Sequence, residues 1–140
     1  MIRIDAERII MIHEEYTKKI LKAFYNVYNE LGYGFLEKVY GNAMVVELAK
    51  MDVRVRQQEN IRVYYQGVQV GDYYADLYVD DTIIVELKAA ETLRIEHVAQ
   101  LVNYLKATDI EVGLLLNFGK KPEFKRRIFT NERKKRIRSV

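Results

Sequence analysis

The stretch that decides the fold is GDYYADLYVDDTIIVELKA, residues 71–89, which predicts two β-strands joined by a tight turn. Three ionisable side chains, Asp76, Glu86 and Lys88, interrupt its series of Tyr, Val, Ile and Leu residues. An unpaired charge is very costly to bury, so charges in an apolar strand need partners. The geometry of this hairpin therefore decides whether the three groups lie close enough to act as one another's partners.

The length of the turn determines which residues face each other. Side chains alternate along a strand, and directly opposed residues of an antiparallel pair share a face. A two-residue loop at residues 80–81 would oppose Asp76 to Val85, whereas a three-residue loop at 80–82 opposes Asp76 to Glu86. The three-residue loop also gathers an apolar layer on the other face: Leu77, Val79, Ile83, Val85 and Leu87. Because register follows the hydrophobic pattern, we expect the three-residue loop or an equivalent bulge.

The predicted register places two carboxylates side by side, with the Lys88 ammonium two residues along the strand. Two close carboxylates predict a site for a divalent cation such as Mg²⁺ or Mn²⁺, because hard cations take oxygen ligands. A nearby lysine can orient or help to deprotonate a bound water, or stabilise charge on a phosphate. The alternative is an exposed ladder of ion pairs, and the apolar layer behind the carboxylates favours the cation site.

Length and composition limit the class of protein. The 140 residues are 49% hydrophobic and 31% charged, and we expect one globular domain over residues 1–140. There is no cysteine, which excludes disulfide and thiol chemistry. No apolar run approaches the roughly 18 residues of a membrane span. The N-terminus, MIRIDAERII, is charged and unlike a signal peptide, so we expect a cytoplasmic protein without membrane contact.

Positive charge is concentrated at the C-terminal end. Residues 120–140 hold ten basic and two acidic side chains and so carry +8, whereas the rest of the chain carries −5. A basic terminal segment is typical of polyanion binding, although a solvated tail that aids solubility explains the charge equally well. The candidates for contacts with nucleic acid are Lys120, Lys121, Lys125, Arg126 and Arg127.

Hydrophobic periodicity predicts helices over residues 7–31, 36–50 and 93–106. It predicts a strand at 61–66 before the central hairpin, an almost wholly apolar interior strand at 111–118 and a last strand at 124–129. For the second helix, the expected apolar face includes Leu36, Val39, Tyr40, Ala43, Val46 and Leu48. The order predicts an α/β (α+β) fold in which a mixed sheet is flanked by helices, with a basic segment over 130–140 to finish.

These residues resemble a known pattern. Asp76, then Glu86-x-Lys88 on the next strand, then a helix that carries Gln100, is similar to the PD-(D/E)XK nuclease superfamily, although Ala75 replaces the proline. The predicted order resembles that superfamily's restriction-endonuclease-like α-β-β-β-α-β core. More specifically, residues 34–40, GFLEKVY, match the pattern of the GxxExxY family, a branch of that superfamily. The resemblance extends from about residue 9 to residue 128.

The resemblance assigns roles that spacing alone does not supply. It implies that Asp76 and Glu86 bind the metal, with the main-chain carbonyl of Leu87 as a further ligand, and that Lys88 positions or activates the attacking water. It also implies that Glu37 is an acid pointing from a helix into the site and that Gln100 is an auxiliary polar residue. Tyr40 and Tyr104 are expected to support them. Taken singly, Glu37 is better explained by the dipole of the helix that it begins, which favours a carboxylate in the first turn.

The expected function is therefore Mg²⁺-dependent hydrolysis of phosphodiester bonds in nucleic acid, with DNA favoured over RNA. One alternative is a non-catalytic module that binds nucleic acid or protein on a nuclease-like fold, because fold does not imply function. A weaker alternative is a structural homodimer whose interface uses some of the 11 tyrosines. The superfamily includes restriction, repair and junction-resolving enzymes, and the sequence does not choose among them.

Overall fold

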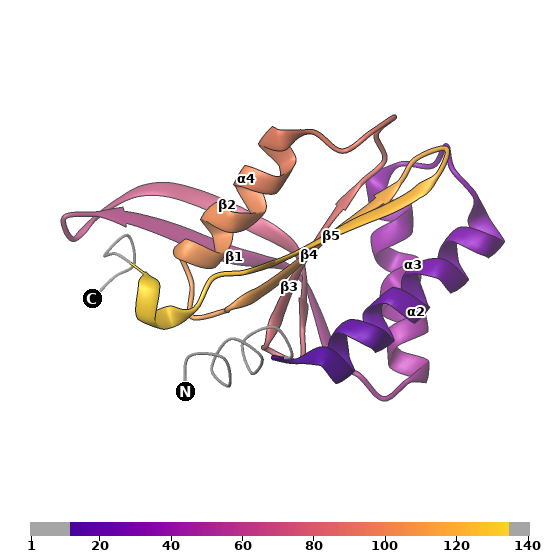
Figure 1. Ribbon diagram of the computed structural model, residues 1–140, viewed down its shortest axis with the longest axis horizontal. Helices are drawn as coiled ribbons and strands as arrows, with labels where there is room; N and C mark the ends of the chain where they lie inside the picture. The colour runs from indigo at the N-terminus through magenta and orange to yellow at the C-terminus, as the bar shows by residue number, and fades with distance from the viewer. Residues whose placement is uncertain (1–11, 135–140) are drawn as a thin grey trace, which may run out of the picture.

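A computed structural model describes residues 12–134 and contains a mixed five-stranded sheet with helices on both faces (Figure 1). The strand order is β1-β2-β3-β4-β5, in which only the β3–β4 pair is parallel. The elements are α2 (Glu14–Leu31), α3 (Glu37–Lys50), β1 (Val55–Tyr65), β2 (Val68–Val79), β3 (Ile83–Lys88), α4 (Ile95–Lys106), β4 (Val112–Phe118), β5 (Pro122–Ile128) and a short 3₁₀ helix (Asn131–Arg133). The predicted α+β class is confirmed.

Two hydrophobic cores lie on the two faces of the sheet. The first, here called the α2–α3 core, joins one sheet face to residues of α2 and α3 such as Phe24 and Met44. The second, the α4 core, joins the other face to residues of α4 such as Leu101 and Leu105. β4 lies between β3 and β5 and is buried along its whole length, as its apolar sequence predicted. α4 is the crossover that allows β4 to run parallel to β3.

The predicted register of the central hairpin is confirmed. β2 ends at Val79 and β3 begins at Ile83, which leaves a three-residue loop in which Asp80 and Asp81 have φ of 50° and 56°. Val79 pairs with Ile83 and Leu77 with Val85, so Asp76 and Glu86 face each other in the next row. The five apolar residues predicted to form one layer all belong to the α2–α3 core.

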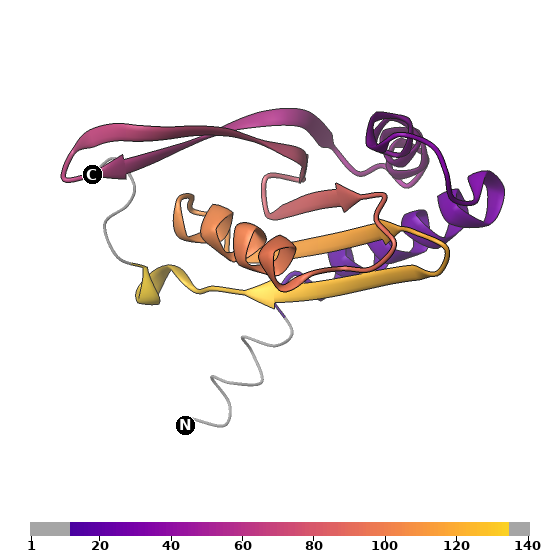
Figure 2. The same cartoon turned by 90° about the horizontal axis from the view of Figure 1, so that it is seen from above.

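At Asp76, the side chains on one face of β2 change from the α2–α3 core to the α4 core. Leu77 and Ala75 are two residues apart and would share a face in a regular strand, yet Leu77 lies in the α2–α3 core and Ala75 in the α4 core. On β1, Gln58 stands opposite Asp76, has a φ of 55° and is omitted from the strand pairing. Beyond this irregular row the hairpin leaves the sheet and runs beside α4 (Figure 2). Asp76 therefore lies at the point where the hairpin diverges.

Some boundaries differ from the predictions. Within the described residues, the helix predicted over 7–31 begins at Glu14 as α2, because His13 has a left-handed φ of 54°; residues 7–11 of that prediction lie outside the described residues. β1 begins at Val55, six residues before the predicted strand, because it follows the long β2 as its pairing partner. β5 begins at Pro122, two residues before the last predicted strand.

The apolar face expected for the second helix is partly wrong. Leu36, which precedes the helix, is 79% exposed, and Val46 is 56% exposed. α3 instead buries the narrow row Tyr40, Met44 and Leu48 together with Gly41. Residues four apart stack on one line of a helix, and α3 meets α2 and the sheet along that line. Ala43 and Val45 are partly buried against the α2–α3 core, whereas Val39 and Val46 are exposed.

Candidate active site

Asp76 and Glu86 are linked because the side chain of each accepts a hydrogen bond from the backbone of the other's strand. The Asp76 backbone N–H donates to Glu86 Oε2 at 2.8 Å, and the Leu87 backbone N–H donates to Asp76 Oδ2 at 2.8 Å. The regular backbone pairing of β2 and β3 ends at Leu77 and Val85. Beyond that pair, the two hydrogen bonds to the Asp76 and Glu86 side chains join the strands. The other oxygen of Asp76, Oδ1, accepts a long 3.5 Å contact from Gln58 Nε2, its one hydrogen bond among residues 12–134. Each carboxylate thus has one oxygen held by a backbone N–H, and Asp76 also lines a cavity of about 500 Å³.

The surroundings of the two carboxylates disfavour their ionised forms. Glu86 is 5% exposed, and burial, followed by the neighbouring Asp76 carboxylate, raises the pKa of Glu86 to about 8. Burial also raises the pKa of Asp76, and the Glu37 carboxylate adds to this, against the Leu87 N–H and the Lys88 ammonium. Glu37 and Lys88 therefore act electrostatically on both carboxylates. An arrangement of acids that resist ionisation is stabilised by a bound cation.

Tyr40 anchors the loop that presents Glu37. Its hydroxyl donates to the Gly32 carbonyl at 2.7 Å and accepts from the Phe35 N–H at 3.2 Å. The fully buried Tyr40 ring stacks on Phe118, with ring centroids 4.1 Å apart and planes at 12°. Tyr40 thus fixes the chain between α2 and α3, and Glu37 follows as the first residue of α3.

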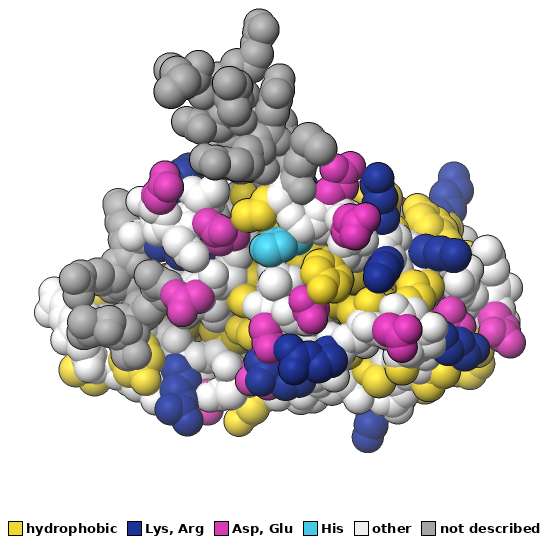
Figure 3. Space-filling view, turned by 90° about the horizontal axis from the view of Figure 1, so that it is seen from below, with side chains coloured by type: hydrophobic (Ala, Val, Ile, Leu, Met, Phe, Trp, Pro, Cys, Tyr) yellow, Lys and Arg dark blue, Asp and Glu magenta, His cyan; other side chains and the backbone are white. Residues whose placement is uncertain are grey.

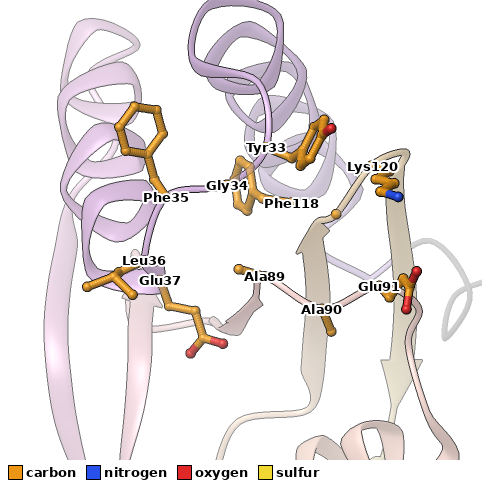
Figure 4. A pocket seen from close by; sticks show the side chains of 11 residues that line it. Tyr33, Gly34, Phe35, Leu36, Glu37, Ala89, Ala90, Glu91, Phe118 and Lys120 are labelled. Carbon is orange, nitrogen blue, oxygen red and sulfur yellow. The ribbon is translucent and has the colours of Figure 1, made fainter.

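Glu37 lines two cavities and so connects them. One, of about 500 Å³, is also lined by Gln58, Asp76 and Leu87. The other, of about 580 Å³, lies between the start of α3 and the chain that leaves β3, and Lys120 contributes to its far wall. Figure 4 shows the Glu37 carboxylate projecting into the space between α3 and Ala89. The predicted helix acid therefore faces the C-terminal end of β3, where Lys88 lies.

Gln100 contacts Tyr104, whose hydroxyl lies near the two carboxylates. Gln100 Nε2 donates to the Tyr104 hydroxyl at 2.9 Å, and within residues 12–134 it makes no hydrogen bond to Asp76 or Glu86. Burial, followed by the Glu86 and Asp76 carboxylates, raises the pKa of Tyr104 to about 12. The Tyr104 hydroxyl is therefore close enough to the Glu86 and Asp76 carboxylates for their negative charge to disfavour its ionisation. Gln100 is placed as a support of Tyr104.

The five basic candidates do not share one surface. Lys120 and Lys121 are exposed at the β4–β5 turn, and Lys125 is exposed on β5. Arg126 points to the opposite face of β5 from its neighbours, and its guanidinium donates to the Ile12 carbonyl at 2.6 Å, where it holds the start of α2. Arg127 Nη1 donates to the Arg126 carbonyl at 2.8 Å. On the face seen in Figure 3, basic and acidic side chains are interspersed.

Asn117 is a residue of this region whose role spacing did not predict. Its fully buried amide accepts from the Ala90 N–H and donates to the Ala90 carbonyl, both at 2.9 Å. Asn117 pairs with Lys88 in the β3–β4 register, so it fixes the chain immediately after Lys88. A single amide within the apolar strand VGLLLNF was the available signal.

The donor set fits a cation that keeps much of its own water. Within residues 12–134, no three His, Cys, Asp or Glu side chains lie together closely enough to hold a metal ion. Mg²⁺ is commonly held by one or two carboxylates, with waters and substrate phosphates completing its octahedron. Asp76 and Glu86 supply two carboxylates, and Leu87, whose main-chain carbonyl is the expected further ligand, lines the same cavity as Asp76.

Comparison with known families identifies the chain. A family model of the PD-(D/E)XK nuclease superfamily matches residues 14–127, and the chain therefore belongs to this superfamily. Searches of curated proteins and of solved structures found no match. Membership indicates a nuclease-like function with nucleic acid as the partner, and nucleases of this superfamily generally use divalent metals. In the described part of the chain, no helix has the length and apolarity that a bilayer span requires.

Proposed function

We propose that this protein hydrolyses phosphodiester bonds in nucleic acid with Mg²⁺ or Mn²⁺ held by Asp76, Glu86 and the main-chain carbonyl of Leu87. The observation that carries the proposal is the pair of carboxylates cross-linked through the backbones of β2 and β3, both with raised pKa values. When bound, the cation would neutralise the charge that develops on the scissile phosphate. The same cation would remove the cost of keeping two buried acids ionised together.

The remaining side chains have separate tasks in this proposal. The Lys88 ammonium, next to both carboxylates, positions the attacking water and offsets negative charge at the phosphate. Glu37 supplies a second acidic wall across the cleft. Tyr104, held by Gln100, limits access of water to the buried side of Glu86. None of these roles requires a side chain to move far, which is what preorganised catalysis needs.

The substrate backbone is proposed to lie on the exposed cations near the cleft. Lys120 lines the cleft that contains Glu37, and Lys121, Lys125 and Arg127 continue along the β4–β5 hairpin. Contacts of this kind release counterions, so binding weakens steeply with salt. They position the strand without reading its sequence. Arg126 contributes less, since its guanidinium is used to hold α2. DNA is the first substrate that we would test, ahead of RNA.

We also propose that the chain belongs to the GxxExxY branch and works as one domain. The support is structural: Gly34, with a φ of 112°, Glu37 and Tyr40 act as one unit that presents a carboxylate. Only a residue without a Cβ adopts such a φ without strain.

A non-catalytic binding module is the second candidate. It is favoured by the pKa of Glu86, which at about 8 leaves this carboxyl protonated at neutral pH until a cation displaces the proton. A weak cation site would allow the fold to bind nucleic acid without cutting it. The two functions differ in one measurable respect, namely metal-dependent cleavage.

Cleavage of a substrate panel tests the proposal. Single-stranded, duplex and branched DNA and RNA are incubated with Mg²⁺ or Mn²⁺ and with wild type, Asp76→Asn or Lys88→Met. The matched controls are Asp72→Asn, an exposed carboxylate on the same strand, and Lys50→Met, an exposed lysine of α3. Cleavage lost in the two site variants and kept in the controls supports the proposal. Equal cleavage by all five proteins would mean a contaminating nuclease. No cleavage by a wild type that demonstrably binds metal favours the binding module.

A further inference from the structure

A groove runs between α4 and the part of the β1–β2 hairpin that has left the sheet. Its volume is about 680 Å³. The hairpin contributes Val63, Val70 and Tyr73, and α4 contributes His97, Gln100 and Asn103. Of the residues that line it, Glu96 is the one acid and none is Lys or Arg. A groove of this composition is unsuited to phosphate and suited to a flat, neutral ring system.

Tyr73 offers an aromatic surface in this groove. It is 46% exposed, and its ring centroid lies 5.7 Å from that of Tyr104 at an interplanar angle of 46°. Gly71 makes room for this placement, since a Cβ there would lie 3.1 Å from Tyr73 Cε2 and 3.2 Å from Val63 Cβ. The Tyr73 ring is therefore supported by packing while much of its surface is still open to a ligand.

The groove adjoins the candidate active site. Tyr104 lines the groove and is also the phenol whose pKa the Glu86 and Asp76 carboxylates raise. Tyr73 precedes Asp76 by three residues on β2, roughly 10 Å along an extended strand. A nucleotide whose neighbouring phosphate lies at the carboxylates would bring its base to this groove.

We propose that the groove takes an unpaired nucleobase, which stacks on Tyr73 while the amides of Gln100 and Asn103 face its edge. Aromatic stacking is the usual source of affinity for single strands, and side-chain amides match the donors and acceptors of bases. The preferred substrate is then single-stranded nucleic acid or the single-stranded part of a larger structure. This inference rests on the proposed function, because it places the base beside the phosphodiester that the site would cut.

Binding of a fluorescent 12-nucleotide single strand tests the inference, in a buffer with chelator so that cleavage cannot contribute. Stacking of one base on one aromatic side chain corresponds to roughly 5- to 150-fold in affinity, which is the loss expected for Tyr73→Ala. Tyr73→Phe should bind as wild type does. The matched control is Tyr74→Ala, on the same strand, 53% exposed and outside the groove lining; its affinity should stay within about twofold of wild type.

Two further readouts separate stacking from phosphate contact. The slope of log K against log salt should be the same for Tyr73→Ala as for wild type, because no phosphate contact is removed. An abasic strand of equal length should bind wild type and Tyr73→Ala equally. Equal losses from Tyr73→Ala and Tyr74→Ala, or a Tyr73→Ala loss of equal size on the abasic strand, would overturn the inference. Thermal unfolding confirms that each variant is folded, and Tyr73→Leu repeats the test with apolar packing on Tyr104 retained.

These measurements are independent of catalysis. A protein that binds single strands through Tyr73 but cleaves nothing with any metal contradicts the proposed hydrolysis and leaves base binding supported. A protein that cleaves but binds equally well without Tyr73 contradicts the base site alone.

Discussion

Replacing Glu86 by glutamine should change how the stability of the metal-free protein depends on pH. The pKa of Glu86 is raised from an ordinary 4.5 to about 8, mainly by burial. Below pH 4.5 the carboxyl is protonated in both folded and unfolded protein and costs nothing. As pH rises from 4.5 towards 8, the unfolded chain loses this proton while the folded chain retains it, so stability falls. Glu86→Gln removes the titration and should flatten this part of the curve.

The size of the effect follows from the shift. At 1.36 kcal/mol per pKa unit, the whole shift corresponds to roughly 5 kcal/mol, of which roughly 3 kcal/mol is lost by pH 7. The raised pKa of Asp76 acts in the same direction and persists in Glu86→Gln. From pH 5 to pH 7 we therefore expect the stability of Glu86→Gln relative to that of wild type to rise by roughly 2–3 kcal/mol.

Urea unfolding at pH 5, 6, 7 and 8 with chelator, followed by circular dichroism, measures this difference. Glu30→Gln, an exposed carboxylate of α2, is the control. With Mg²⁺ at 100 times its Kd, wild type should gain about 2.7 kcal/mol, and Glu86→Gln much less. Identical pH dependence in wild type and Glu86→Gln would refute the argument, because the buried carboxyl would then titrate normally.

Four other substitutions test single contacts. Tyr40→Phe removes the hydroxyl that holds the α2–α3 loop and should cost about 1–3 kcal/mol of unfolding free energy and lower any cleavage activity, as urea titration and rate measurements would reveal. Asn117→Leu leaves both polar groups of Ala90 without their partner and should destabilise the fold by about 2–4 kcal/mol; a stability equal to wild type would show that water replaces the amide. Arg126→Met should lower stability by about 1–3 kcal/mol with little effect on the salt dependence of nucleic-acid binding, whereas Lys125→Met should reduce the salt slope by about 1 and leave stability unchanged.

The central hairpin shows how far sequence reasoning extends. One register places Leu77, Val79, Ile83, Val85 and Leu87 in a single layer, and that register opposes Asp76 to Glu86. Because a one-residue slip would turn one strand's part of this layer to the opposite face of the sheet, the pattern favours this pairing without reference to the rest of the chain. The interior strand at Val112–Phe118 was predictable for a similar reason, since a strand buried on both faces is apolar throughout.

The second helix shows where sequence reasoning fails. Its sequence is apolar around much of its circumference, so periodicity alone did not select the buried side. Contact with α2 and the sheet buries Tyr40, Met44 and Leu48 and exposes Val46. Arg126 is a similar case, because charge predicted an exposed cation, while the packing of β5 against the start of α2 directs its guanidinium to a carbonyl.

The sequence by itself determined the class of the fold, the hairpin register and the meeting of Asp76 with Glu86, because these depend on local alternation and turn length. Only the tertiary structure decided that Glu37 faces the same cleft, that Gln100 supports Tyr104, and that Asn117 fixes the chain after Lys88. Glu37 and Asn117 are far along the chain from the residues that they approach, and Gln100 and Tyr104, four residues apart on α4, are brought near the carboxylates by the packing of that helix. Their geometry depends on how helices pack on a twisted sheet, and no local pattern encodes that packing.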